Sequence, residues 1–257
     1  MLSKLLGRKK KSRKIDQASV PEGRRIYAIG DVHGRNDKLH ELLKKIDQDD
    51  LDRDIAETTV IFLGDLIDRG PDSKQVLDTA LALSKNNKNI RFLMGNHEEV
   101  MLSAATGDEK SVRFFYKIGG KETILSYDIS KTEFQSLSME QLAERLPTLI
   151  PQEHITFMQS FEDMIVIGDY AFVHAGIRPE VALSEQQPKD LRWIRERFIH
   201  HEGDHEKIIV YGHTISKTEV EDRSRIGIDT GAYESGVLTA LCLEGNERWY
   251  LNTKADV

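Results

Sequence analysis

A short acidic loop that follows an apolar run is the first stretch of the sequence that could do chemistry. Residues 60–63 read as a buried strand, and Asp65, Asp68 and Arg69 follow it, with a Gly-Pro turn signal directly behind them. Ligands bind beside the carboxyl ends of strands in open α/β sheets. These three side chains could therefore hold a metal ion, move a proton and grip a phosphate, although an Asp-rich surface turn would look similar by itself.

Four more polar clusters stand at or near the ends of other strand-like runs. Counted with Asp65, the side chains that can ligate a metal are Asp31, His33, Asp65, Asn96, His174 and His213. The set is larger than one ion needs when positions stay open for a substrate, but it suits two ions if one group bridges them. Asp65 is the natural bridge, because a carboxylate has two oxygens and Asp65 lies in the middle of the set. Oxygen and imidazole ligands without a thiolate favour two divalent ions, Mn first, with Fe, Zn, Co or Ni as alternatives.

Alternating strands and helices must position these clusters. Three times in the first hundred residues, a strand-like run ends in a polar cluster led by glycine and a helical pattern follows. This order predicts an α/β architecture with a site along one sheet edge. Residues 103–160 are mostly helical in pattern and predict an inserted helical cap. The expected strands cover residues 24–29, 59–63, 90–94, 164–167, 170–173, 207–211, 225–228, 237–243 and 248–251.

The composition is that of an ordinary soluble globular protein. The 257 residues are 31% charged and 39% hydrophobic. The one cysteine, Cys242, excludes an intrachain disulfide, and nothing indicates an oxidising compartment. No apolar run approaches the ~18 residues of a transmembrane helix, and the first residues do not form a signal peptide. We therefore expect a cytoplasmic protein without a transmembrane segment.

The charge is distributed unevenly along the chain. The net charge is −7, yet residues 1–14 hold seven basic residues and no acid, which leaves 29 basic against 43 acidic residues elsewhere. A basic arm on an acidic body could contact anionic lipid or nucleic acid, but a solvated, mobile terminus is the favoured interpretation. We expect a basic flexible tail over residues 1–22 and a single domain over residues 23–257. The acidic body argues against a broad nucleic-acid surface.

Five motifs, taken in order, resemble the signature of the calcineurin-like metallophosphoesterase superfamily. They are Gly30-Asp31-Val32-His33-Gly34, Gly64-Asp65-Leu66-Ile67-Asp68-Arg69-Gly70, Gly95-Asn96-His97-Glu98, Val173-His174-Ala175-Gly176 and Gly212-His213-Thr214. The closer resemblance is to the PPP-type serine/threonine protein phosphatases in their bacterial and phage form. It implies an α/β/β/α sandwich in which two central mixed sheets are flanked by helices and carry a helical insertion.

The resemblance also distributes the ligands over two metal ions. It implies that Asp31, His33 and Asp65 hold one ion. The other ion would be held by Asp65, Asn96, His174 and His213, so that Asp65 bridges the pair. Asn96 is also expected to contact the substrate.

Four further residues match catalytic positions of the family. His97 matches the general acid that protonates the leaving alkoxide, and Asp68 matches its partner carboxylate. Arg69 matches an arginine that grips the phosphate. A second such arginine usually lies between the last two metal histidines, and Arg195, two residues after Trp193, is the expected one.

These roles predict a metal-dependent phosphoester hydrolase that uses a metal-activated water. The first expectation is a serine/threonine protein phosphatase, because diadenosine tetraphosphate hydrolases of the superfamily commonly lack an acidic residue where this chain has Asp68. The alternative is a bis(5'-nucleosyl)-tetraphosphatase or another small-molecule phosphoesterase. Arg35 and Ala175 depart from the eukaryotic pattern and indicate the bacterial subgroup. The expected partner is accordingly a phosphorylated protein or a small phosphoester.

A non-enzyme alternative is a phospho-ligand-binding protein that keeps the fold and docks through its basic tail. A degenerate site would be expected to have lost a ligand. None of the six ligand positions is missing here, which favours the enzyme.

Overall fold

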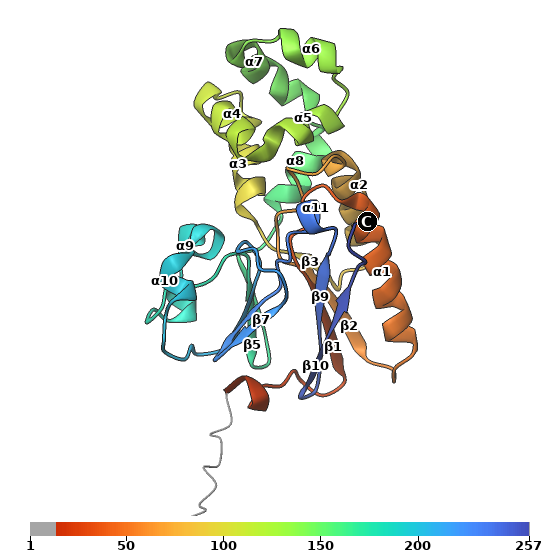
Figure 1. Ribbon diagram of the computed structural model, residues 1–257, viewed down its shortest axis with the longest axis vertical. Coiled ribbons are helices and arrows are strands. Elements are labelled where there is room, and N and C mark those ends of the chain that lie inside the picture. The colour runs from red at the N-terminus through yellow and green to blue at the C-terminus, as the bar shows by residue number, and fades with distance from the viewer. Residues whose placement is uncertain (1–13, 257) are drawn as a thin grey trace, which may run out of the picture.

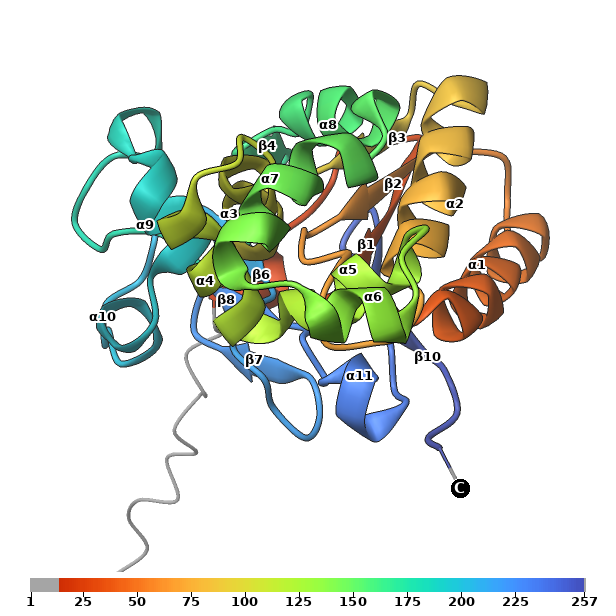
Figure 2. The ribbon, with the colours of Figure 1, turned by 90° about the horizontal axis from the view of Figure 1, so that it is seen from above.

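Two five-stranded sheets pack against each other in the computed structural model, which describes residues 14–256 (Figure 1). Helices cover the outer face of each sheet, and a further group of helices lies above the sheets at one end (Figures 1 and 2). The expected α/β/β/α sandwich is confirmed. No helix in the described part of the chain is long and apolar enough to cross a membrane.

Each sheet contains three adjacent parallel strands. The first sheet has the order β10-β9-β1-β2-β3, and its strands are β1 (Arg24–Ile29), β2 (Glu57–Phe62), β3 (Ile90–Phe92), β9 (Thr239–Glu244) and β10 (Glu247–Asn252). The second has the order β4-β5-β6-β8-β7, with β4 (Met164–Ile167), β5 (Tyr170–Val173), β6 (Ile208–Tyr211), β7 (Val220–Asp222) and β8 (Arg225–Gly227). Strands β1, β2 and β3 are mutually parallel, as are β5, β6 and β8. Six strand ends are therefore available to build one site.

Alternation along the strands supplies two cores from one sheet. On β1, Ile26 and Ala28 pack into the core between the sheets, whereas Tyr27 and Ile29 pack under the helices. Successive side chains of a strand point to opposite faces. Both faces are buried, so these strands read in the sequence as continuous apolar runs.

The outer helices close the two flanks. Helices α1 (Asn36–Leu51) and α2 (Ser73–Asn86) cover the first sheet. The second sheet packs against η3 (Leu183–Glu185), α9 (Pro188–Trp193) and α10 (Glu196–Ile199). A short helix, α11 (Ala232–Ser235), follows β8.

The upper helices form a cap over the sheet edge. They are α3 (Asn96–Ala104), α4 (Glu109–Phe115), the π-helix η2 (Tyr116–Gly120), α5 (Lys121–Ser126), α6 (Lys131–Ser136), α7 (Met139–Leu149) and α8 (Gln152–Gln159). An aromatic cluster joins this cap to the first sheet. The ring of Phe92 lies 4.8 Å from that of Phe62, 5.0 Å from Phe157 and 5.2 Å from Phe161, centroid to centroid.

One expectation about the chain needs correction, and one strand was not predicted. The flexible tail was expected to reach residue 22, but Ile15, Ala18 and Val20 are buried in the core between the sheets. Lys14–Gln17 forms the 3-10 helix η1, and the Val20 amide donates to the Gly245 carbonyl at 2.8 Å. Residues 1–13, which carry six of the seven basic residues of the expected tail, lie outside the described residues. Strand β7 was not predicted, because this short edge strand has no apolar pattern.

The aromatic joint predicts a stability effect. Phe157→Ala removes a ring that is 7% exposed and packs on Phe92, so we expect a loss of about 3 kcal/mol in the free energy of unfolding. Urea denaturation measures the loss. The control is Val166→Ala, since Val166 is 47% exposed on β4 and should cost less than about 0.5 kcal/mol. Equal losses of unfolding free energy for the two substitutions would show that the aromatic cluster does not stabilise the packing of the cap on the sheet.

Candidate active site

The predicted polar residues meet where the parallel strands end. The pairs Asp31 and His33, Asp65 and Asp68, and Asn96 and His97 follow β1, β2 and β3, and His174 and His213 follow β5 and β6. All eight side chains are buried. The backbone passes close to them: a Cβ atom on Gly95 would lie 2.2 Å from Asp65 Oδ1, and one on Gly212 would lie 2.0 Å from Asp31 Oδ1. Only glycine therefore fits at these two motif positions.

Left-handed backbone turns the site residues inward. Of the seven non-glycine residues with positive φ among residues 14–256, five belong to the predicted site: His33, Asp65, Asp68, Arg69 and His213. Such conformations are costly for residues with a Cβ and concentrate at functional sites. Each of these loops directly follows a packed strand, and the packing of the strand maintains the strained conformation.

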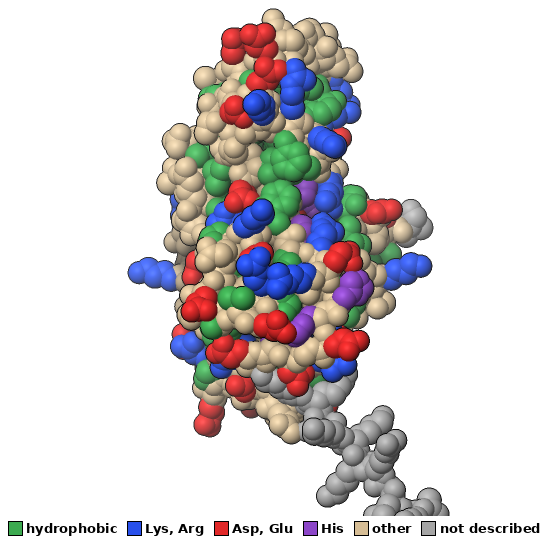
Figure 3. Space-filling view, turned by 90° about the vertical axis from the view of Figure 1, so that its left-hand side faces the viewer, with side chains coloured by type: hydrophobic (Ala, Val, Ile, Leu, Met, Phe, Trp, Pro, Cys, Tyr) green, Lys and Arg blue, Asp and Glu red, His purple; other side chains and the backbone are tan. Residues whose placement is uncertain are grey.

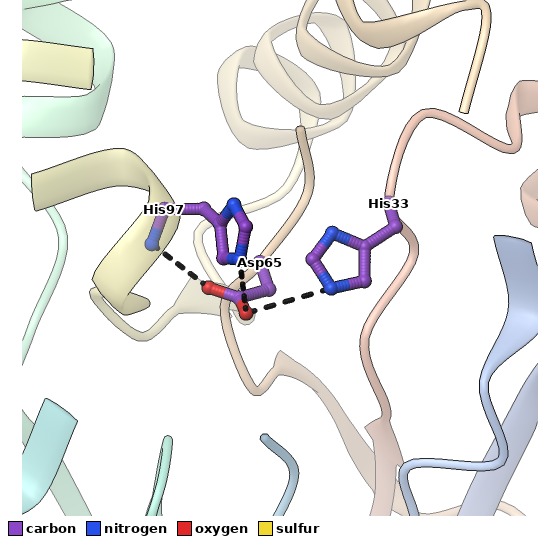
Figure 4. Close-up of side chains that lie close together, drawn as sticks. All are labelled: His33, Asp65 and His97. Atoms are coloured by element: carbon purple, nitrogen blue, oxygen red, sulfur yellow. Dashed lines mark hydrogen bonds and ion pairs between the residues drawn. The ribbon is translucent and has the colours of Figure 1, made fainter. Parts of the chain in front are cut away.

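His33, Asp65 and Asp31 form a first group of ligand atoms. His33 Nδ1 donates to the Ile67 carbonyl at 2.7 Å, which leaves Nε2 with its lone pair 3.6 Å from Asp65 Oδ2 (Figure 4). Asp31 Oδ2 accepts the His213 amide at 2.9 Å. His33 Nε2 and Asp31 Oδ1 are buried and have no hydrogen-bond partner. Acceptor atoms left in this way fit a bound cation.

A second group surrounds His174. Its Nδ1 donates to the Leu63 carbonyl at 2.8 Å, so Nε2 again carries a lone pair. That atom lies 3.0 Å from Asn96 Oδ1, 3.2 Å from His213 Nδ1 and 3.4 Å from Asp65 Oδ1. An imidazole lone pair cannot donate to an amide or carboxylate oxygen. A cation between these acceptors would resolve the conflict, so the donor set fits a divalent metal.

The protonation states suit metal binding. Burial lowers the pKa of His33 and His174, and it lowers that of His213 to about 2, so the imidazoles are neutral. Burial, followed by the charges of Asp229 and Asp65, raises the pKa of Asp31. Neutral imidazoles beside crowded carboxylates make an environment that favours cations.

His97 stands between the metal groups and a second carboxylate. Its Nδ1 lies 2.6 Å from Asp68 Oδ2, and its Nε2 faces Asp65 Oδ2 at 3.8 Å (Figure 4). Burial opposes the charged imidazole, but Asp65 and Asp68 raise the pKa of His97 above its ordinary value. Thr123 Oγ1, from the cap, donates to Asp68 Oδ1. His97 is therefore oriented by Asp68, and Asp68 by the cap.

By its position alone, His97 could also be a metal ligand. Among residues 14–256, two groups of His and Asp side chains have ligand atoms within 4.8 Å of one another: His33, Asp65 and His97, and Asp65, His174 and His213. Asp65 belongs to both groups, as expected for a bridging carboxylate. The first group contains His97 in place of the expected Asp31.

The two expected arginines differ in how closely they approach the site. Arg69 Nη2 lies 3.2 Å from His97 Nε2, and the guanidinium sits 4.9 Å from the centroid of the Tyr233 ring. Arg195 is exposed, and its charge lowers the pKa values of His174 and His213. Arg69 is thus inside the cluster, and Arg195 stands at its rim.

Two buried acids in the site were missed by the sequence reasoning. The Glu98 carboxylate accepts hydrogen bonds from the backbone amides of Asp65 and Leu66, both at 2.8 Å, and thereby fixes the loop that follows β2. Asp229 follows β8 and is 2% exposed. Asp229-Thr230-Gly231 after a strand-like run is a polar cluster of the same kind as the others, and that signal could have found it.

Comparisons of the sequence point to phosphoesterases. The asymmetrical bis(5'-nucleosyl)-tetraphosphatase PrpE of Anoxybacillus flavithermus is 30% identical over 237 residues, which cover 83% of this chain and 88% of that relative. The symmetrical bis(5'-nucleosyl)-tetraphosphatase of Delftia acidovorans is 40% identical over 88 residues, which cover 34% of this chain and 28% of the relative. The named relatives act on dinucleotides, so the expected protein-phosphatase branch is not shown.

Solved structures share the fold. A crystal structure of a candidate diadenosine tetraphosphatase aligns with a TM-score of 0.62 at 19% identity and covers 92% of this chain and 97% of its own. The cold-active protein-tyrosine phosphatase of a Shewanella species aligns with a TM-score of 0.55 at 20% identity, covering 95% and 85%. The calcineurin-like phosphoesterase family model matches residues 24–241. The chain therefore belongs to the calcineurin-like phosphoesterase family.

Proposed function

We propose that the chain is a metal-dependent hydrolase of bis(5'-nucleosyl) tetraphosphates. Hydrolysis of a phosphoester follows from the family, and the substrate is the proposal. It is supported by the relative from Anoxybacillus flavithermus, which aligns over most of both chains. The structural observation that carries it is an aromatic surface that includes Trp193, two residues before Arg195 in the sequence.

That surface consists of Phe114 and Trp193, which come from the cap and from α9. Their ring centroids lie 6.1 Å apart at 26°, and Phe114 is 43% exposed. Trp193 Nε1 donates to Glu99, two residues after His97, and Arg195 follows Trp193 by two residues. On the face drawn in Figure 3, hydrophobic side chains lie beside His and basic side chains. An exposed aromatic ring close in the sequence to Arg195, which is expected to bind phosphate, suits a nucleotide, because a base stacks on an exposed ring.

In this proposal each group of ligand atoms holds one divalent ion. Asp31, His33 and Asp65 take the first, and Asp65, Asn96, His174 and His213 take the second. When bound, the ions would supply Lewis acidity, activating the attacking water and offsetting phosphate charge. Arg69 and Arg195 would bind phosphate oxygens, with Asn96 beside them. Asp68 would hold His97 Nδ1, so that His97 Nε2 faces the leaving oxygen as proton donor.

A second candidate is hydrolysis of phosphoserine or phosphothreonine monoesters. The 2.6 Å contact between His97 and Asp68 favours it, because an alkoxide is a poor leaving group that needs a proton. A nucleotide leaves as a phosphate anion and needs the proton much less. The two substrates therefore place different demands on His97.

Metal removal tests the first part of the proposal. EDTA should abolish hydrolysis of p-nitrophenyl phosphate, and Mn²⁺ should restore it. At 100 times its Kd, an ion bound only by the folded state adds about 2.7 kcal/mol of stability, visible as a higher Tm. Asp65→Asn should lose both effects because Asp65 serves both groups, whereas Asp47→Asn, on the exposed side of α1, should keep them. Turnover that persists in EDTA would contradict a metal-dependent enzyme.

Replacing His97 separates the two substrate classes. His97→Asn should slow hydrolysis of a phosphoserine peptide by about 100-fold or more, the usual effect of a general acid. Hydrolysis of p-nitrophenyl phosphate and of diadenosine tetraphosphate should fall much less, because their leaving groups are stable anions. Binding of two Mn²⁺ ions by the variant, measured calorimetrically, shows that the site is otherwise intact. Equal losses on all three substrates would remove His97 from the acid role.

The aromatic surface predicts a selective change in KM. Phe114→Ala should weaken binding of diadenosine tetraphosphate by about 1 kcal/mol, or roughly fivefold in KM, and leave a phosphoserine peptide unaffected. Tyr116→Ala is the matched control, since Tyr116 is a cap aromatic that is 36% exposed but stacks on Phe134 instead. An unchanged KM for the dinucleotide in the Phe114 variant would argue against the nucleotide substrate.

A further inference from the structure

Asp229 follows β8, the one parallel strand whose end contributed no predicted site residue. The segment is fixed against the first motif: a Cβ on Gly30 would lie 2.5 Å from the Ile228 carbonyl oxygen. The Asp229 carbonyl accepts the Ser216 amide at 3.0 Å. With Asp229 included, all six parallel strands deliver a polar side chain to the same place.

One oxygen of the Asp229 carboxylate has no partner. Oδ1 accepts the Gly231 amide at 2.9 Å, whereas Oδ2 is buried without a hydrogen bond. Asp31 Oδ1 and His33 Nε2 share this property. After burial, the charge of Asp229 is the main cause that raises the pKa of Asp31. Burial also raises the pKa of Asp229, and Asp65 is the charged group that adds most to that rise. A buried carboxylate oxygen without a donor is costly, so the position calls for a donor that binds there.

We propose that Asp229 is a positioning residue for the divalent ion held by Asp31, His33 and Asp65, and that its free oxygen accepts a hydrogen bond from water on that ion. This inference rests on the metal site of the proposed function. Three protein ligands leave positions that water fills, and each such water needs acceptors. A carboxylate only accepts, and Oδ2 is the unused acceptor beside Asp31. Partners of this kind tune metal affinity without touching the ion.

A purely structural role would use only the bond to Gly231. Asp229→Asn separates the two roles, because the asparagine carbonyl oxygen still accepts the Gly231 amide. The substitution removes the charge and replaces the free acceptor oxygen by an NH₂ donor. Water on a cation would then meet a donor where it needs an acceptor.

The test is a calorimetric titration of metal-free protein with Mn²⁺. We expect wild type to bind two ions and Asp229→Asn to bind one of them about tenfold more weakly. In EDTA the Tm of the variant should equal or exceed that of wild type, because one of three crowded carboxylates has lost its charge. The rise in Tm on adding Mn²⁺ should be smaller than in wild type. Asp47→Asn is the charge-matched control and should titrate like wild type.

Two results would overturn the inference. One is an Asp229→Asn variant that binds both ions as tightly as wild type. The other is a lower Tm in EDTA with unchanged Mn²⁺ affinity, which would assign Asp229 to the turn alone. If the Asn variant does not fold, Asp229→Ser keeps an acceptor for Gly231 and should show the same loss of affinity. Wild type that binds two ions without hydrolysing the dinucleotide would reject the proposed substrate, while the variants would still support the role of Asp229.

Discussion

Repulsion among buried carboxylates is the constraint on which the rest of the site depends. Asp31, Asp65 and Asp229 are each at most 2% exposed, and their charges act on one another. Burial and like charge both raise the free energy of such a group. Burial lowers the pKa of His33 and His174, so these imidazoles are neutral and supply no positive charge against the repulsion. A cluster of this kind is stable when a cation joins it, which is why folding and metal binding should be linked in this protein.

The scaffold holds the cluster together with left-handed backbone conformations that are costly for residues other than glycine. Parallel strands from two sheets bring their carboxyl ends to one edge, and the loops that leave them turn through left-handed conformations. Glu98 binds the amides at the turn that presents Asp65. Gly95 and Gly212 let the chain pass within contact of the ligand side chains. The stability of the apolar cores on the faces of the sheets compensates for this strained edge.

What the sequence could predict follows from where each residue stands. The runs that precede the motifs read as strands in the sequence, and a glycine or a polar residue marks where each run ends, so the positions of Asp65, Asn96 and His174 at strand ends could be predicted. Asp229 was missed although a strand over residues 225–228 was expected, because the polar cluster after that strand matched none of the five motifs. Burial of Ile15 and Val20 was missed because these residues lie among polar neighbours in the sequence. Only the three-dimensional structure shows that they pack in the core between the sheets. The roles of the site residues remain predictions that depend on bound metal.

The cap connects the chemistry of the site to the choice of substrate. Gly119 accepts the Arg69 amide at 3.1 Å, and Thr123 binds Asp68, so two cap residues hold the loop that follows β2. The same cap carries Phe114 at the rim. A change in the cap would therefore alter the rim and the support of His97 together. In the proposed function, the strand ends would supply the hydrolysis of a phosphoester, and the cap would select the leaving group that meets His97.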